Sequence, residues 1–176
     1  MSHYNIERIA EVLKSSYLQE ADANGRIEHL LIDSRRIIHP ATALFFALKT
    51  ARRDGHDYIN EAYNKGVRHF IVQQQVDIKA LSGANVLLVS DTLKALQQLA
   101  AYHRQQFSIP VIGITGSNGK TIVKEWLYQL LSDHYNIIRS PKSYNSQVGV
   151  PLSVWQLQPQ HTLAIFEAGI SQQGEM

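Results

Sequence analysis

The sequence predicts an α/β fold in two parts. The first, residues 1–107, is a small N-terminal α/β domain, and the second, from residue 108, opens a parallel-sheet domain with a phosphate-binding loop (P-loop). Two observations predict this. Short apolar runs of strand length alternate with segments of helical periodicity along the first hundred residues. A glycine-rich turn, Gly113–Thr121, which reads G-I-T-G-S-N-G-K-T, then joins an apolar run to an amphipathic segment.

The first part begins with a helix that Asn5 can cap and whose apolar positions fall on one face. Strand-like runs follow at 27–33 and 43–48, and a helix at 58–65 ends before Gly66, a plausible C-terminal cap. Residues 69–72 and 86–89 have strand length, and 92–106 has helical spacing. The stretch 107–110 contains a proline and breaks that helix, so we place the domain boundary there.

The second part begins with a strand at 111–114, the glycine-rich turn and a helix. The apolar positions of this helix are at helical spacing: Val123, Trp126, Leu127, Leu130 and Leu131. A second buried strand is expected at 162–166, with Glu167 at its end. Too few residues follow Pro110 to complete a nucleotide-binding sheet and cover its edges. We therefore expect this chain to be the front of a longer protein.

The composition excludes several classes of function. The chain has 176 residues, a formal charge of +2 and no dense basic run of the kind that nucleic-acid binding needs. It has no cysteine, and its eight histidines are scattered without a His-x-x-x-His pair, which argues against disulfides and zinc. No signal segment and no apolar stretch of membrane-spanning length occurs. We expect a soluble cytoplasmic protein with no membrane insertion.

The glycine-rich turn predicts a site for nucleotide phosphates. Gly116, Ser117, Asn118 and Gly119 would offer backbone amides, and the glycines permit positive φ and close approach of an anion. Lys120 would bring a mobile positive charge to the β- and γ-phosphates, and Thr121 a hydroxyl ligand to magnesium. The general spacing G-x-x-x-x-G-K-[ST] is missed by one residue, whereas the longer pattern G-x-T-G-x-N-G-K-T fits. The competing interpretation is a strand-to-helix turn that binds nothing.

Glu167 is the second candidate of this site. Ligands of open α/β sheets bind at the carboxyl ends of the strands, so a carboxylate there faces the same crevice as the P-loop and can hold Mg²⁺ beside Thr121. The alternative is a solvated carboxylate at a strand end.

Three further polar stretches carry weaker signals. Asp33-Ser34-Arg35 follows a strand and could bind an anion, since arginine is a planar fork suited to phosphate. Asp54-Gly55-His56 and the loop 140–151, which contains Asn145, complete the group. On their own, all three favour the plainer interpretation: a turn with a surface arginine, a turn with a surface imidazole, and a loop with a structural proline.

Together these segments resemble the Mur ligase family, the ATP-dependent amide ligases of peptidoglycan precursor synthesis. The resemblance covers nearly the whole chain in the right order. It rests on Asp33-Ser34-Arg35, Leu44–Lys49, Asp54–Asp57, Gly113–Thr121, Asn145 before Gly149-Val150-Pro151, and Glu167-Ala168-Gly169 before Gly174-Glu175. It implies an N-terminal UDP-sugar (substrate) domain at 1–107 and the opening part of a central P-loop ATPase domain at 108–176.

The resemblance also implies chemistry and partners. In the subgroup that this chain resembles most, D-alanyl-D-alanine is added to UDP-N-acetylmuramoyl-tripeptide through an acyl phosphate, with ATP and Mg²⁺. Lys120 and Glu167 would be catalytic, with Thr121 and Glu167 as metal ligands. The residues that would bind substrate are Ser34, Arg35, Lys49, Asp54, His56 and Asn145. Ser171-Gln172 and Ser143 depart from residues common in such ligases.

Several alternatives stay open at this level. The chain could belong to another, amino-acid-adding Mur ligase, or act as a UDP-sugar-binding module without chemistry. Folate ligases lack a domain with Asp33-Ser34-Arg35, which argues against them. The Arg52–His56 form resembles versions fused to an alanine racemase, so a fused C-terminal racemase domain is one expectation for the full-length protein. We expect the 176-residue chain to be inactive alone.

Overall fold

The chain divides into two compact units, 1–99 and 100–176, and the division falls within helix α3 (Thr92–Gln105). The structure is a computed structural model, which describes residues 3–50, 53–142 and 144–169. Each unit is α/β, as the sequence predicts. The domain boundary expected after residue 107 stays a prediction.

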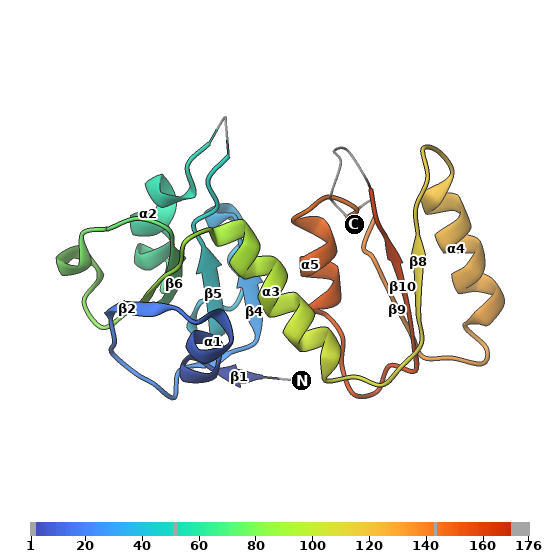
Figure 1. Cartoon of the computed structure of the whole chain (residues 1–176), viewed down its shortest axis with the longest axis horizontal. Helices are drawn as coiled ribbons and strands as arrows, with labels where there is room; N and C mark the ends of the chain where they lie inside the picture. The colour runs from blue at the N-terminus through green and yellow to red at the C-terminus, as the bar shows by residue number, and fades with distance from the viewer. Residues whose placement is uncertain (1–2, 51–52, 143, 170–176) are drawn as a thin grey trace. The chain divides into compact units, whose positions relative to one another are not determined.

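The N-terminal unit is built on a five-stranded sheet in the order β2-β7-β6-β5-β4. Figure 1 labels β6, β5 and β4 as neighbouring strands of this sheet. The four strands β4 to β7 are parallel, and β2 runs antiparallel at the β7 edge. A separate pair, β1 and β3, is antiparallel. The bounds are β1 Tyr4–Asn5, α1 Ile6–Leu13, β2 Ser16–Gln19, β3 Arg26–Ile27, β4 His29–Leu31, β5 Ala43–Phe46, α2 Ile59–Asn64, β6 His69–Val72 and β7 Asn85–Leu88.

The core of this unit follows from its parallel strands. Every residue of β5 and β6 is buried, as expected where both faces of a parallel sheet are covered. Phe45 and Phe70 pack edge to face and share one cluster with Ile59 and Ala62 of α2. Helix α1 starts where predicted, because the Asn5 side chain accepts a hydrogen bond from the backbone N–H of Arg8 at 2.9 Å. Helix α2 therefore packs on the buried strands of the sheet in one apolar cluster.

The strand predicted at 27–33 is wrong as a single element. Glu28 divides it: β3 before this residue pairs with β1, and β4 after it pairs with β5. The backbone N–H of Glu28 donates to Thr42 O at 2.9 Å, which holds the chain where it changes partners. Strand β2 was not predicted, because its residues, Ser16–Gln19, are only partly buried and lack a clear alternation.

The C-terminal unit is a three-layered arrangement with a parallel sheet in the middle. Its strand order is β8-β10-β9, and Figure 1 shows α4 on one side of the strands and α5 on the other. One apolar cluster joins Ile165 to Leu127 and Leu131 of α4, and the other joins Phe166 to Val154 of α5. The bounds are β8 Val111–Ile114, α4 Lys120–Leu131, β9 Ile137–Arg139, α5 Gly149–Val154 and β10 Leu163–Glu167.

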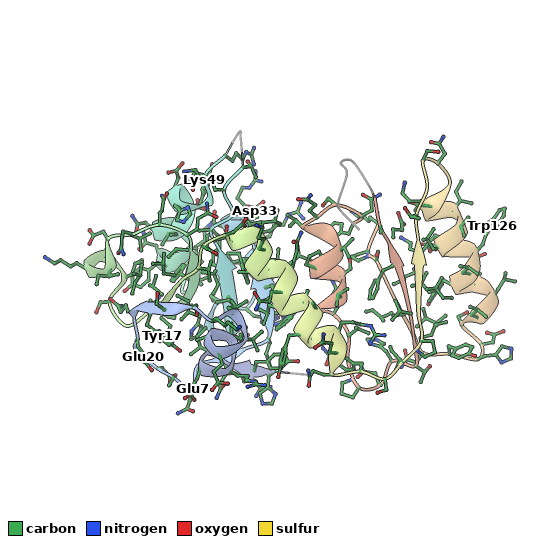
Figure 2. The ribbon with its side chains drawn as sticks, in the orientation of Figure 1. Glu7, Tyr17, Glu20, Asp33, Lys49 and Trp126 are labelled. Atoms are coloured by element: carbon green, nitrogen blue, oxygen red, sulfur yellow. The ribbon has the colours of Figure 1, made fainter. Side chains whose placement is uncertain are left out.

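One side of the C-terminal unit is not closed. Ile122, Trp126 and Leu130 of α4 are 58%, 64% and 73% exposed, and β8 is an edge strand. Figure 2 shows Trp126 on the side of α4 that points away from the strands. The apolar residues that predict this helix therefore have two different environments. Leu127 and Leu131 face the sheet, whereas Val123, Trp126 and Leu130 form an exposed apolar face.

Candidate nucleotide-phosphate site

The P-loop occupies the turn between β8 and α4. Gly116 and Gly119 have φ of +132° and +78°, a region that favours glycine. A Cβ at either position would meet no heavy atom within 4 Å, so the loop borders open space. Helix α4 begins at Lys120 with no side-chain cap on its first amides and no acidic residue in its first turn. Free amides at a helix N-terminus favour an anion such as phosphate.

The side chain of Lys120 lies back across this loop. Its Nζ donates to Gly116 O at 2.5 Å. The ammonium therefore stays beside the loop amides, and a phosphate bound there would replace a carbonyl oxygen as its partner.

Glu167 reaches the P-loop through the parallel pairing of β10 with β8. In that register Glu167 lies opposite Ile114, the last residue of the strand that feeds the loop. The Thr121 hydroxyl donates to Glu167 Oε2 at 3.1 Å, across 46 residues of sequence. Glu167 is fully buried. The two side chains that the sequence predicts to share a metal ion are thus brought together at one sheet edge.

Lys124 is a buried neighbour that sequence reasoning missed. Its Nζ lies 2.8 Å from Glu167 Oε1, and both side chains are fully buried. The same Nζ donates to Ser140 O at 2.9 Å and to Lys142 O at 2.5 Å. Glu167 Oε1 has the ion pair but accepts no hydrogen bond of good geometry. A signal was available: Lys124 follows Thr121 by three residues, which puts both on one helix face.

Asn145 lies at the same sheet edge. The backbone N–H of Gly169, two residues after Glu167, donates to Asn145 O at 2.7 Å. A Cβ on Gly169 would come within 2.9 Å of that oxygen, so the two backbones are in close contact. On the other side of Asn145, Gly149 packs as closely on Tyr144. The Asn145 loop is therefore packed against the end of β10.

The donor atoms at this edge are those that Mg²⁺ prefers. Thr121 offers a hydroxyl oxygen and Glu167 a carboxylate oxygen, both hard ligands. Residues 3–50, 53–142 and 144–169 contain no group of three or more His, Asp or Glu side chains that could hold a metal ion. Mg²⁺ is commonly held by one or two carboxylates together with substrate phosphates, and the pair fits that mode.

In the N-terminal unit, Asp33-Ser34-Arg35 form a local turn after β4. Both carboxylate oxygens of Asp33 accept from the Arg35 side chain, at 2.9 Å and 2.7 Å, and Oδ1 also accepts from its backbone N–H. These bonds hold the pKa of Asp33 well below its usual range. The Arg35 side chain is 69% exposed, whereas Ser34 is buried, with its carbonyl accepting from Lys65 Nζ. Arg35 is therefore the member of this pair that a ligand in solution can reach.

Lys49, Asp54 and His56 form a second cluster after β5. Asp54 pairs with Lys49 Nζ at 3.2 Å through Oδ2 and with His56 Nδ1 through Oδ1. His56 Nε2 accepts from the backbone N–H of Gln73, and its side chain is only 5% exposed, so it is not a surface imidazole. Burial by itself would raise the pKa of Asp54. Hydrogen bonds from the His56 backbone N–H, the His56 ring and the Lys49 side chain have the larger effect, and they lower this pKa to about 2. Figure 2 shows Asp33 and Lys49 at the same end of the N-terminal unit.

A separate hollow of about 570 Å³ lies beside the start of α3. Lys14, Ser90 and Lys94 are among its lining residues, and none of the sequence-predicted site residues is. Asp91 Oδ1 already accepts the amides of Leu93 and Lys94 there, so this helix N-terminus has its cap. The hollow therefore adds nothing to the candidate site.

The remaining sequence signals fall outside the described residues. These are Arg52, Ser143 and the segment 171–175 with Ser171-Gln172 and Gly174-Glu175. In the part of the chain that the structure describes, none of the helices is long and apolar enough to cross a membrane.

Fold and site together define a class: an α/β protein with a P-loop and a strand-end carboxylate at the same edge of a parallel sheet. Comparison with known families narrows it. Residues 26–104 match the Mur ligase family, catalytic domain, and residues 114–176 match the Mur ligase middle domain. The chain belongs to the Mur ligase family.

Individual relatives agree with this assignment. The chain is 33% identical over 171 residues to UDP-N-acetylmuramoyl-tripeptide–D-alanyl-D-alanine ligase of Bacillus subtilis (strain 168), covering 97% of this chain and 37% of the relative. A crystal structure of MurF from Acinetobacter baumannii matches with a TM-score of 0.89 at 30% identity, over 99% of this chain and 37% of that one. MurF ligase from Thermotoga maritima in complex with ADP matches with a TM-score of 0.73 at 30% identity, over 84% and 33%. The chain thus spans little more than a third of these proteins.

Proposed function

We propose that the full-length protein is an ATP-dependent amide ligase that adds D-alanyl-D-alanine to UDP-N-acetylmuramoyl-tripeptide. The names of the relatives supply the substrates, and the ADP in the Thermotoga maritima complex supports a nucleotide as co-substrate. The substrate carboxylate attacks the γ-phosphate of ATP to give an acyl phosphate, and the amine of the dipeptide then displaces phosphate. This places the enzyme in peptidoglycan precursor synthesis, and we propose a cytoplasmic location.

The observation that carries the proposal is the hydrogen bond from Thr121 Oγ1 to Glu167 Oε2, 3.1 Å long, beside an open P-loop. Phosphoryl transfer needs positioning and neutralisation of charge more than covalent help from the protein. The amides of Gly116, Ser117, Asn118 and Gly119 cradle the phosphates, and Lys120 exchanges its bond to Gly116 O for the β- and γ-phosphates.

Thr121 and Glu167 are the residues that would hold Mg²⁺. The ion would supply neutralisation of negative charge on the nucleotide phosphates. Glu167 contributes one negative charge in a fully buried position, and Thr121 a neutral hydroxyl, so the phosphates complete the ligand set.

The N-terminal unit would hold the UDP-sugar at the carboxyl edge of its sheet. Arg35 and Lys49 are half or more exposed and offer positive charge to the diphosphate. Asp54 and the buried His56 hold the turn that carries Lys49. In the turn that carries Arg35, Ser34 is buried and its carbonyl accepts from Lys65 Nζ. Asn145 would contact the muramoyl-peptide part or the ATP phosphates.

A fused C-terminal alanine racemase domain remains part of the proposal for the full-length protein. It rests on the likeness of Arg52-Arg53-Asp54-Gly55-His56 to fused forms.

The test is a reconstituted ligation. The purified full-length protein is given ATP, Mg²⁺, UDP-N-acetylmuramoyl-tripeptide and D-alanyl-D-alanine, and phosphate release and product mass are followed. We expect phosphate release to require all the substrates and the product to gain one dipeptide. Activity with a single amino acid in place of the dipeptide would assign a different Mur ligase. Binding of the UDP-sugar without phosphate release would reduce the protein to a binding module.

A further inference from the structure

Among the described residues of the C-terminal unit, Lys124 is a fully buried charged group that the proposed chemistry does not use. It lies on the second turn of α4 and is fully buried. Its Nζ joins three segments: Glu167 at the end of β10, and the carbonyls of Ser140 and Lys142 after β9. A buried lysine costs desolvation free energy, and an apolar side chain of similar size often packs as well or better. A role in the nucleotide-phosphate site would explain why a lysine occupies this buried position.

The two oxygens of Glu167 have different neighbours. Oε1 lies 2.8 Å from Lys124 Nζ, and Oε2 accepts from the Thr121 hydroxyl. The backbone N–H of Glu167 donates to Ser140 Oγ at 3.1 Å, which also holds the end of the strand. The carboxylate is thus held with one oxygen against a fixed positive charge and the other toward the P-loop.

The charges around this carboxylate sum to a positive value when no nucleotide is bound. Lys124 cancels Glu167, and Glu125 pairs with Arg139 of β9 at 3.1 Å while lying 3.4 Å from Lys124. Lys120 on the loop then leaves about one positive charge without a partner of opposite sign among these groups. A free divalent cation meets a neutralised carboxylate and an excess of positive charge, which opposes its binding.

We propose that Lys124 is a positioning residue and the built-in counter-charge of Glu167, which prevents the site from holding a divalent cation until nucleotide phosphates bring negative charge. The cation then binds only together with the nucleotide, at the Oε2 and Thr121 side. This rests on the proposed nucleotide site and deepens it. Lysine suits the role because its compact ammonium can serve one carboxylate and two carbonyls at once.

The test is a titration of the full-length protein with Mn²⁺, followed by the electron paramagnetic resonance signal of the free ion. The variant is Lys124→Gln, whose amide can still donate to the carbonyls but has no charge. We expect weak Mn²⁺ binding by the wild-type protein alone and tight binding with ADP. In Lys124→Gln, we expect the affinity for Mn²⁺ without nucleotide to rise at least about tenfold, because one repelling charge is gone.

The matched control is Lys94→Gln, which removes a lysine whose Nζ is 4.0 Å from Asp91 but whose side chain is 81% exposed. We expect it to leave Mn²⁺ affinity unchanged. A purely structural role for Lys124 predicts a lower melting temperature in Lys124→Gln with unchanged Mn²⁺ affinity, and that result overturns the proposal.

A second measurement needs no variant and covers the case in which Lys124→Gln does not fold. Wild-type protein that binds Mn²⁺ as tightly without ADP as with it also overturns the proposal. Failure of the proposed function looks different: in that case ADP itself does not bind, with or without Mn²⁺, and no ligation occurs.

Discussion

Each unit has polar side chains at the carboxyl edge of its own parallel sheet. The two edges differ in which residues contact these side chains. In the N-terminal unit these side chains are bound mainly by residues close in sequence, as Arg35 is by Asp33 and His56 by Asp54. In the C-terminal unit the key contacts join distant segments, Thr121 and Lys124 with Glu167, beside a loop that is open. The N-terminal edge therefore has local turns that carry exposed cations. The C-terminal edge has a loop in which the Cβ positions of Gly116 and Gly119 border open space.

From this difference we propose that the N-terminal unit recognises substrate and that the C-terminal unit carries the chemistry. Local turns leave Arg35 and Lys49 half or more exposed, and we propose that they bind a ligand that is held without being chemically changed. Long-range contacts hold Glu167 in a buried position, and we propose that its charge acts there on a bound phosphate. The two edges should therefore respond differently to substitution.

The largest effect is expected from Lys120→Ala in the full-length protein. Loss of this charge should lower the rate of ligation by roughly 10³-fold or more, because it removes charge stabilisation from phosphoryl transfer. Affinity for the UDP-sugar, measured by calorimetry, should be unchanged. Equal loss of both would break the division of labour between the units. Lys94→Ala, an exposed lysine of α3, is the control.

The next effect concerns packing at one glycine of each unit. A Cβ on Gly55 would lie 2.6 Å from Leu48 N, whereas a Cβ on Gly113 would meet nothing within 4 Å. We expect Gly55→Ala to lower the free energy of unfolding by about 1–3 kcal/mol, through overpacking against backbone that cannot move aside. Gly113→Ala should cause no loss. Denaturant titration of the chain measures both, and a large loss at Gly113 would show that the P-loop edge is not open.

A smaller effect is expected from Asp54→Asn, and it should depend on pH. Since the folded-state pKa of Asp54 is lowered to about 2 from its ordinary value of 3.8, its ionised form stabilises the fold at pH above 4. That contribution is lost as pH falls from about 4 toward 2. We expect Asp54→Asn to cost about 1 kcal/mol at neutral pH and progressively less below pH 4. Thermal unfolding across pH 2–7 checks this, and a pH-independent difference would contradict the assignment.

The smallest effect is expected from Trp126→Gln in the 176-residue chain. This side chain is 64% exposed on α4, so its loss should change the free energy of unfolding by less than about 0.5 kcal/mol. The same change in Phe45, which is buried in the N-terminal unit, should be strongly destabilising. A large cost at Trp126 would mean that this face of α4 is covered in solution.

Much of the fold could be predicted from the sequence, because local patterns specified it. Buried runs such as 69–72 and the cap at Asn5 show their strand and helix in the residues themselves. The split at Glu28 could not be predicted, since it depends on a hydrogen bond to Thr42 and on which strands become neighbours. Strand β2 has too little apolar alternation to stand out, and only its partner β7 makes it a strand.

Some residues of the candidate site could likewise be predicted from the sequence, and others could not. Gly116, Gly119 and Lys120 lie in one short motif whose geometry the spacing already implies. The meeting of Thr121 with Glu167 needed one inference, that parallel strands end at a common edge, and the register of β10 with β8 agrees with it. Lys124 went unnoticed because a lysine on a helix is ordinarily exposed, and only tertiary packing shows it buried. The burial of His56 was hidden for the same reason.

The most direct test of the central claim is calorimetric titration of the full-length protein with ADP and Mg²⁺, compared with Lys120→Ala and Glu167→Gln. We expect binding by the wild-type protein, a loss of nucleotide affinity of at least about tenfold in Lys120→Ala, and loss of the Mg²⁺ dependence in Glu167→Gln. Nucleotide binding that both variants retain at wild-type strength would contradict it.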